Sequence, residues 1–63
     1  MEAHQERVLE ERTQLNDRLV KLDSFLYTEK FNCLSMDDQD LLITQQAFME
    51  RYLDVLDQRI ANF

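Results

Sequence analysis

Apolar residues in the first half of the chain recur at the spacing of an amphipathic helix. They follow one another at steps of seven, four, three and four positions: Val8, Leu15, Leu19, Leu22 and Leu26. Labelled as heptads, they alternate between d and a positions, and Arg12 interrupts one a position. Because polar residues fill the remaining positions, the pattern predicts a helix over about 4–30.

The second half carries more apolar positions than one helix contact requires. One seam has heptad-like spacing: Leu42, Met49, Leu53, Leu56, Ile60 and Phe63. Beside it run two lines with members seven positions apart: Leu41, Phe48 and Val55, then Gln45, Tyr52 and Arg59. A helix that packs on one partner needs an apolar stripe of about 100°. The pattern therefore predicts a second helix over about 36–62 whose second face seeks another partner.

The link between these helices, at 31–35, must form without glycine or proline, since the chain has neither. Ser35 followed by Asp38 resembles a capping box, so Ser35 is expected to begin the second helix. Asn32 tolerates a left-handed conformation and is the predicted end of the first helix. Phe31 is expected to fold back onto the helix ends.

These patterns predict an all-α protein with one domain over residues 1–63. We expect an antiparallel two-helix hairpin, with coiled-coil-like spacing, that self-associates into a helical bundle. So short a chain builds only a small core, and the lone Cys33 closes no internal disulfide. The homo-oligomer is expected to be a dimer or larger.

The charge excludes some partners. The net charge is −6, and residues 32–63 carry six acids against two bases. Direct binding to duplex DNA, which needs several bases on the phosphates, is not expected. No apolar run reaches the roughly 20 residues of a membrane span, and no signal-peptide pattern is present. We therefore expect a cytoplasmic protein without membrane contact.

Catalytic and metal-binding patterns are missing from the sequence. His4 is the single histidine and has no Cys or second His at ligand spacing. Cys33 has no neighbouring base, and its role stays open. The acids near the second helix start, Asp37, Asp38 and Asp40, suit its positive dipole end. The expectation is a non-enzyme with no catalytic residue, no metal and no cofactor.

The line of Gln45, Tyr52 and Arg59, bordered by Phe48, is the candidate ligand-binding site. An aromatic face can stack on a base, an amide can read its edge, and a guanidinium can bind a phosphate. The alternative is architectural. Tyr52 would then cover the core, and Arg59 would pair with an acid of a neighbouring chain.

The chain also resembles a known group of proteins through three segments: "RVLEERTQLNDRLVKLDSFL", "KFNCL" and "DQDLLITQQAFMERYLDVLDQRI". They are similar to a family of small accessory proteins of tailed bacteriophages, including crAss-like phages and prophages, with no assigned function. Its pattern falls here on Phe31, Leu34, Leu41, Leu42, Gln45, Met49, Tyr52, Leu56, Arg59 and Ile60.

The resemblance implies a phage anti-defence protein that neutralises a host immune component in the host cytoplasm. The preferred form is an oligomeric sponge that sequesters a nucleotide second messenger, such as a cyclic nucleotide. The alternatives are a protein–protein inhibitor or regulator, including an acidic nucleic-acid mimic that binds a host defence protein, and a structural assembly module.

Overall fold

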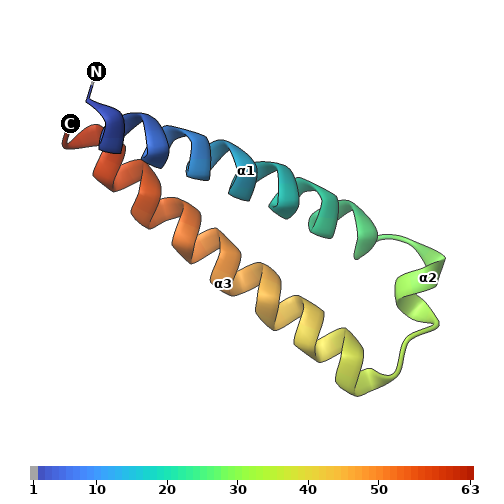
Figure 1. The fold of residues 1–63 in the computed structure, drawn as a ribbon. Helices are drawn as coiled ribbons and strands as arrows, with labels where there is room; N and C mark the ends of the chain where they lie inside the picture. The colour runs from blue at the N-terminus through green and yellow to red at the C-terminus, as the bar shows by residue number, and fades with distance from the viewer. Residues whose placement is uncertain (1) are drawn as a thin grey trace.

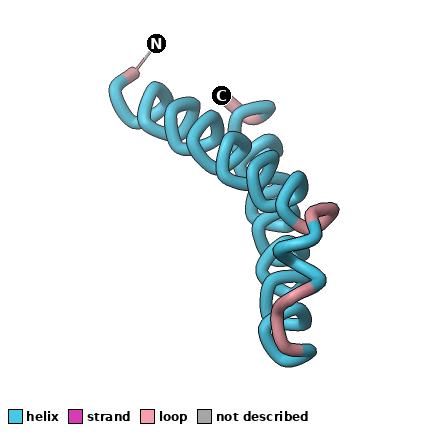
Figure 2. The backbone as a smooth tube through the Cα atoms, turned by 90° about the vertical axis from the view of Figure 1, so that its right-hand side faces the viewer, coloured by secondary structure: helices cyan, strands magenta, loops and turns pink. Residues whose placement is uncertain are grey.

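Two long helices and one short helix make up the computed structural model, which describes residues 2–63. They are α1 (Ala3–Phe25), α2 (Glu29–Asn32) and α3 (Met36–Ala61). The long helices run side by side in opposite directions, with both chain ends at the same end of the molecule (Figure 1). Loops are confined to the link and the ends, and residues 2–63 contain no strand (Figure 2). The predicted all-α class is confirmed.

The first long helix ends earlier than the predicted position near residue 30. It stops at Phe25, and the separate turn of α2 follows. Thr28 makes this break, because its Oγ1 donates to the Phe25 carbonyl oxygen at 2.7 Å and accepts from the Phe31 N–H at 3.3 Å. One hydroxyl thus satisfies a carbonyl at one helix end and an amide at the next helix start.

The turn into α3 confirms one prediction and corrects another. Ser35 Oγ accepts from the Asp38 N–H at 3.1 Å, so Ser35 caps α3 as predicted. Asn32 does not adopt a left-handed conformation, since no residue among 2–63 has a positive φ. It is instead the last residue of α2. The Gln39 side chain gives one carbonyl of the turn a hydrogen-bond partner, because its Nε2 donates to the Leu34 carbonyl oxygen at 2.9 Å.

The core lies between α1 and α3 and is small. Its buried members are Val8, Leu15 and Leu56, and Leu56 is fully buried. Partly buried residues of the same α3 seam pack against them: Met49, Leu53 and Ile60. Near the link, Phe31 is buried and meets the Phe25 ring edge to face, as its predicted return onto the helix end requires.

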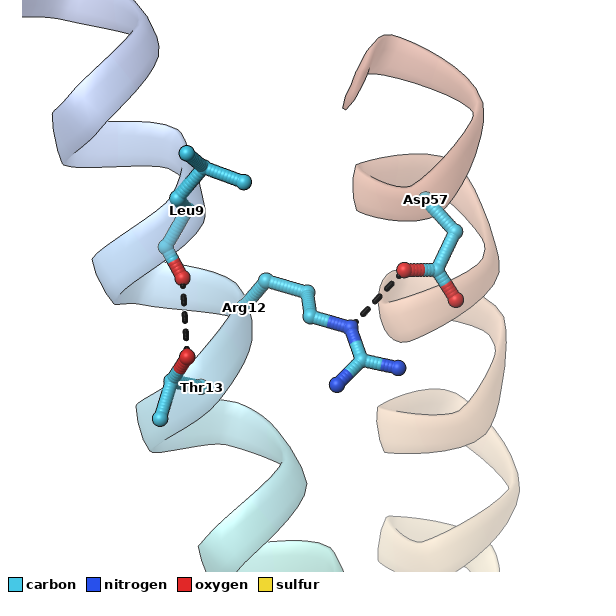
Figure 3. A network of polar contacts seen from close by, with 4 residues as sticks. All are labelled: Leu9, Arg12, Thr13 and Asp57. Atoms are coloured by element: carbon cyan, nitrogen blue, oxygen red, sulfur yellow. Dashed lines mark hydrogen bonds and ion pairs between the residues drawn. The ribbon is translucent and has the colours of Figure 1, made fainter. Parts of the chain in front are cut away.

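Two polar contacts join the long helices outside this core. Arg12 Nε donates to Asp57 Oδ1 at 2.8 Å, which explains a charged residue at an a position (Figure 3). The hydrogen bond to Asp57, and then its negative charge, raise the pKa of Arg12. Nearer the link, Gln46 Nε2 donates to Asp23 Oδ1 at 2.6 Å. Each contact links one position of α1 to one position of α3 beside the apolar core.

Candidate functional site

One face of α3 carries all four residues of the predicted ligand-binding site. We define the α3 stripe as six residues at alternating steps of four and three: Leu41, Gln45, Phe48, Tyr52, Val55 and Arg59. All lie within the single helix α3, and all are exposed. Alternating steps of this kind keep side chains on one side of a helix. The structure therefore places the predicted residues along one continuous line.

The α3 stripe borders the core but is not part of it. Phe48, Tyr52 and Val55 each precede a residue of the core seam by one position. Successive residues of a helix are rotated by about 100°, so the stripe is turned by that angle from the seam that packs on α1. The contrast between neighbours is sharp: Leu56 is 0% exposed and Val55 is 52% exposed.

The apolar members of the stripe are open to solvent over most of their surface. Phe48 is 70% exposed and Leu41 is 67% exposed, whereas Tyr52 is 43% exposed. Large apolar side chains in a continuous exposed line are typical of a binding surface, whereas scattered ones are normal on any protein. The spacing, not the mere exposure, makes this line a candidate site.

The polar members of the stripe have few contacts inside the chain. Gln45 Nε2 makes one weak hydrogen bond, to Met49 Sδ at 3.6 Å. Among residues 2–63, no carboxylate lies within ion-pair distance of Arg59, in contrast to the paired Arg12. The guanidinium of Arg59 is therefore free to bind an external anion.

The spacing of the polar groups along the stripe limits which ligand can contact them together with Tyr52. Tyr52 lies seven residues from both Gln45 and Arg59, or about 10 Å along the helix in each direction. A single base stacked on Tyr52 would not touch both polar groups. A nucleotide, in which the ribose separates the base from the phosphate, could reach from the Tyr52 ring to one of them.

The other candidate residues remain apart. Cys33 is exposed near the link, and His4 lies at the chain ends, within 3.4 Å of Glu2 and with its ring against that of Phe63. Within the described residues, no group of three His, Cys, Asp or Glu side chains could hold a metal ion. Nor does any described helix combine the length and apolar character of a membrane span.

Sequence reasoning missed some exposed apolar residues around the link. Tyr27 is 84% exposed two positions after the end of α1, and Met36 is 74% exposed at the start of α3. Ile43 is also exposed, although it lies outside the stripe. Tyr27 follows the last apolar position of the α1 heptads. Its place outside this pattern was the signal in the sequence that it would be exposed.

The fold and the site thus define a class of protein: a small helical protein with an exposed face of aromatic and polar side chains. The family model described as Sequestin matches residues 2–62, nearly the whole chain. The chain belongs to the Sequestin family. It is also 41% identical, over 63 residues, to a protein of Enterobacteria phage T4.

That relative is described as an uncharacterized 7.5 kDa protein in the denB-rIIB intergenic region, and the match covers 100% of this chain and 98% of the relative. No solved structure matches the chain. These comparisons support the resemblance to small phage accessory proteins, whereas the crAss-like type stays a prediction.

Proposed function

We propose that this protein is a phage anti-defence protein that sequesters a nucleotide second messenger made by the host immune system. The α3 stripe carries the proposal, because it holds aromatic, amide and guanidinium groups in one exposed line. The family description, Sequestin, and the phage T4 relative are consistent with a sequestering phage protein. In this proposal the antiparallel helices form a hairpin unit that self-associates and acts in the host cytoplasm.

Each group of the site has a distinct role in this proposal. Tyr52 and Phe48 offer π-faces for a nucleobase, a contact worth about 1–3 kcal/mol per base. Gln45 offers both a donor and an acceptor to the edge of that base. Arg59 offers a charged fork to a phosphate oxygen pair, which is the strongest type of hydrogen bond available to the stripe.

We propose binding without chemical conversion. The stripe contains no His, Asp, Glu, Lys or Cys, which are the side chains that most often act as general base or nucleophile. A protein of this kind neutralises a signal by stoichiometric capture. Its effect should therefore saturate at a fixed ratio of protein to nucleotide.

A second candidate function follows from the link end of the molecule. Tyr27 and Met36 are exposed there, close in sequence to the acids Asp37, Asp38 and Asp40. A mixed apolar and acidic surface suits a protein–protein inhibitor, and an acidic surface can imitate nucleic acid. In this alternative the target is a host defence protein, and the stripe is architectural.

Native mass spectrometry with a panel of cyclic nucleotides tests the proposal. We expect a discrete mass increment per oligomer for one nucleotide. Arg59→Ala should weaken that binding by about tenfold to a hundredfold while the fold and assembly are kept. Arg51→Ala is the matched control, because Arg51 is an exposed arginine of α3 outside the stripe.

Three results would contradict this proposal. They are the absence of a mass increment with every nucleotide, an Arg51→Ala variant that loses as much binding as Arg59→Ala, and an Arg59→Ala variant whose oligomer dissociates. The last result would make Arg59 a contact between subunits. Co-purification of a host protein without any bound nucleotide would instead favour the inhibitor.

A further inference from the structure

The two hydrogen bonds between the long helices show which of their residues lie at the same level. Arg12 of α1 bonds to Asp57 of α3, and Asp23 of α1 bonds to Gln46 of α3. The residue numbers of each pair add up to 69, as expected for antiparallel helices with the same rise per residue. Along this part of the molecule, a residue of α1 therefore lies level with the residue of α3 that brings the total to about 69.

The same hydrogen bonds mark one edge of the helix pair. Asp23 and Asp57, one from each helix, each follow a leucine of the apolar seam by one position. Because the helices run in opposite directions, positions that follow the seam in α1 and in α3 share one edge, and positions that precede it share the other. Tyr52 precedes a seam residue of α3, so the α3 stripe lies on this second edge. Arg18 precedes a seam leucine of α1 and lies on the same edge.

Two bases of α1 are level with the aromatic residues of the stripe. Arg18 is level with residue 51, one position from Tyr52, and Lys21 is level with Phe48. Lys21 is three positions after Arg18, which makes the two bases neighbours on the surface of α1. Both are exposed, and among residues 2–63 neither has a carboxylate within ion-pair distance. Two cations without ion-pair partners thus border the two rings.

We propose that Arg18 and Lys21 form a phosphate-binding position of the ligand site, which then spans both long helices. Packed helices have axes about 8–10 Å apart, so a nucleotide stacked on Tyr52 can extend across to α1. Arginine offers a charged fork to phosphate oxygens, and lysine offers a compact charge. This position is level with the ring, whereas Arg59 lies about 10 Å further along α3.

Two separate cationic positions specify a ligand with two phosphate groups. This inference rests on the proposed function and narrows its ligand to a nucleotide whose base stacks on Tyr52 between two phosphates. One phosphate meets Arg59, and the other meets the α1 bases. The net charge of −6 repels anions in general, so capture of such a ligand depends on cations gathered in one place. A nucleotide with a single phosphate occupies only one of the two positions.

Glu11 provides a test with the opposite sign. It is level with residue 58, next to Arg59, and it precedes the seam position Arg12, which places it on the edge of the stripe. Its negative charge therefore opposes a phosphate bound at Arg59. Glu11→Gln should tighten nucleotide binding severalfold, whereas Glu6→Gln, turned by about 140° around α1, should not. Unchanged or weaker binding by Glu11→Gln would contradict the placement of the ligand along this edge.

Titration with inorganic pyrophosphate tests the new position without any nucleotide. In NMR spectra of the arginine Nε–H and lysine side-chain groups, we expect the signals of Arg18 and Lys21 to shift. Arg51 and Lys30 are exposed bases elsewhere, and their signals should stay in place. Equal shifts for all four bases, or no shift for Arg18 and Lys21, would overturn the inference.

Calorimetry with nucleotides provides the second measurement. Cyclic dinucleotides, which have two phosphates, should bind more tightly than cyclic mononucleotides, which have one. Replacing both α1 bases, Arg18→Gln with Lys21→Gln, should weaken dinucleotide binding by about tenfold to a hundredfold and remove most of this difference. Arg51→Gln is the control, and circular dichroism checks that each variant keeps its helices.

The two measurements separate this inference from the proposed function. If a nucleotide binds and the double variant keeps wild-type affinity, the inference is wrong although capture stands. If pyrophosphate shifts the α1 bases but no nucleotide binds, the phosphate-binding position stands and the proposed function fails.

Discussion

Replacing the fully buried Leu56 by alanine tests whether α3 has one core face and one free face. Leu56 is 0% exposed and lies in the cluster with Val8 and Leu15. Truncation of a buried leucine costs about 2–5 kcal/mol, from lost burial and from the cavity that remains. Domain stability is commonly about 0.05–0.15 kcal/mol per residue, or about 3–9 kcal/mol for 63 residues, so Leu56→Ala should remove about half of the free energy of unfolding.

Its neighbour Val55 provides the matched control. Val55 is 52% exposed, and a surface substitution away from special features usually changes stability by no more than about 0.5 kcal/mol. Urea titrations followed by circular dichroism measure both variants. They must be run at one fixed protein concentration, because the proposed self-association would add concentration-dependent stability.

Varying the protein concentration for both variants then distinguishes an effect on packing within the chain from an effect on self-association. Leu56→Ala should lower the unfolding midpoint at every concentration. Val55→Ala should lower it chiefly at high concentration, where the proposed self-association would stabilise the wild-type protein. A Leu56→Ala variant less than about 1 kcal/mol below wild type would refute the assignment of Leu56 to the core.

Two further predictions concern local contacts. Ser35→Ala should destabilise the protein by about 1 kcal/mol in thermal melts, because the Asp38 N–H loses its cap, whereas Ser24→Ala inside α1 should not. An unchanged midpoint for Ser35→Ala would mean that the cap contributes nothing. Arg12→Leu, which restores an apolar a position, should raise the melting temperature, and a lower one would show that the contact with Asp57 matters more.

Much of the helical architecture follows from local patterns in the sequence. The start of α3 was predictable because the hydrogen bond that caps it joins Ser35 to Asp38, only three positions away. Heptad spacing likewise identified the buried positions Val8, Leu15 and Leu56 before their burial was known. The same spacing identified the second, exposed face of α3. These features depend on residues a few positions apart, which any helix brings together.

Other features depend on tertiary structure. They involve residues far apart in the sequence, or residues that could adopt either of two local conformations. Heptad labels show that an arginine interrupts the α1 seam, but only the packing of α1 on α3 brings Arg12 to Asp57. The break after Phe25 depends on Thr28, which could equally have continued the helix. In the folded chain Thr28 caps α2, and the turn that it makes brings Phe31 to Phe25, where Phe31 is buried.

Two adjacent α3 faces carry apolar residues at heptad spacing, and only one of them can pack on α1. The structure buries the leucine-rich seam around Leu56 and leaves Phe48, Tyr52 and Arg59 exposed. The physical reason is that burial would remove water from the polar groups of Tyr52 and Arg59, whereas Leu56 has no polar side-chain group to desolvate. The folded pair of helices therefore exposes the line of side chains that the proposed function requires.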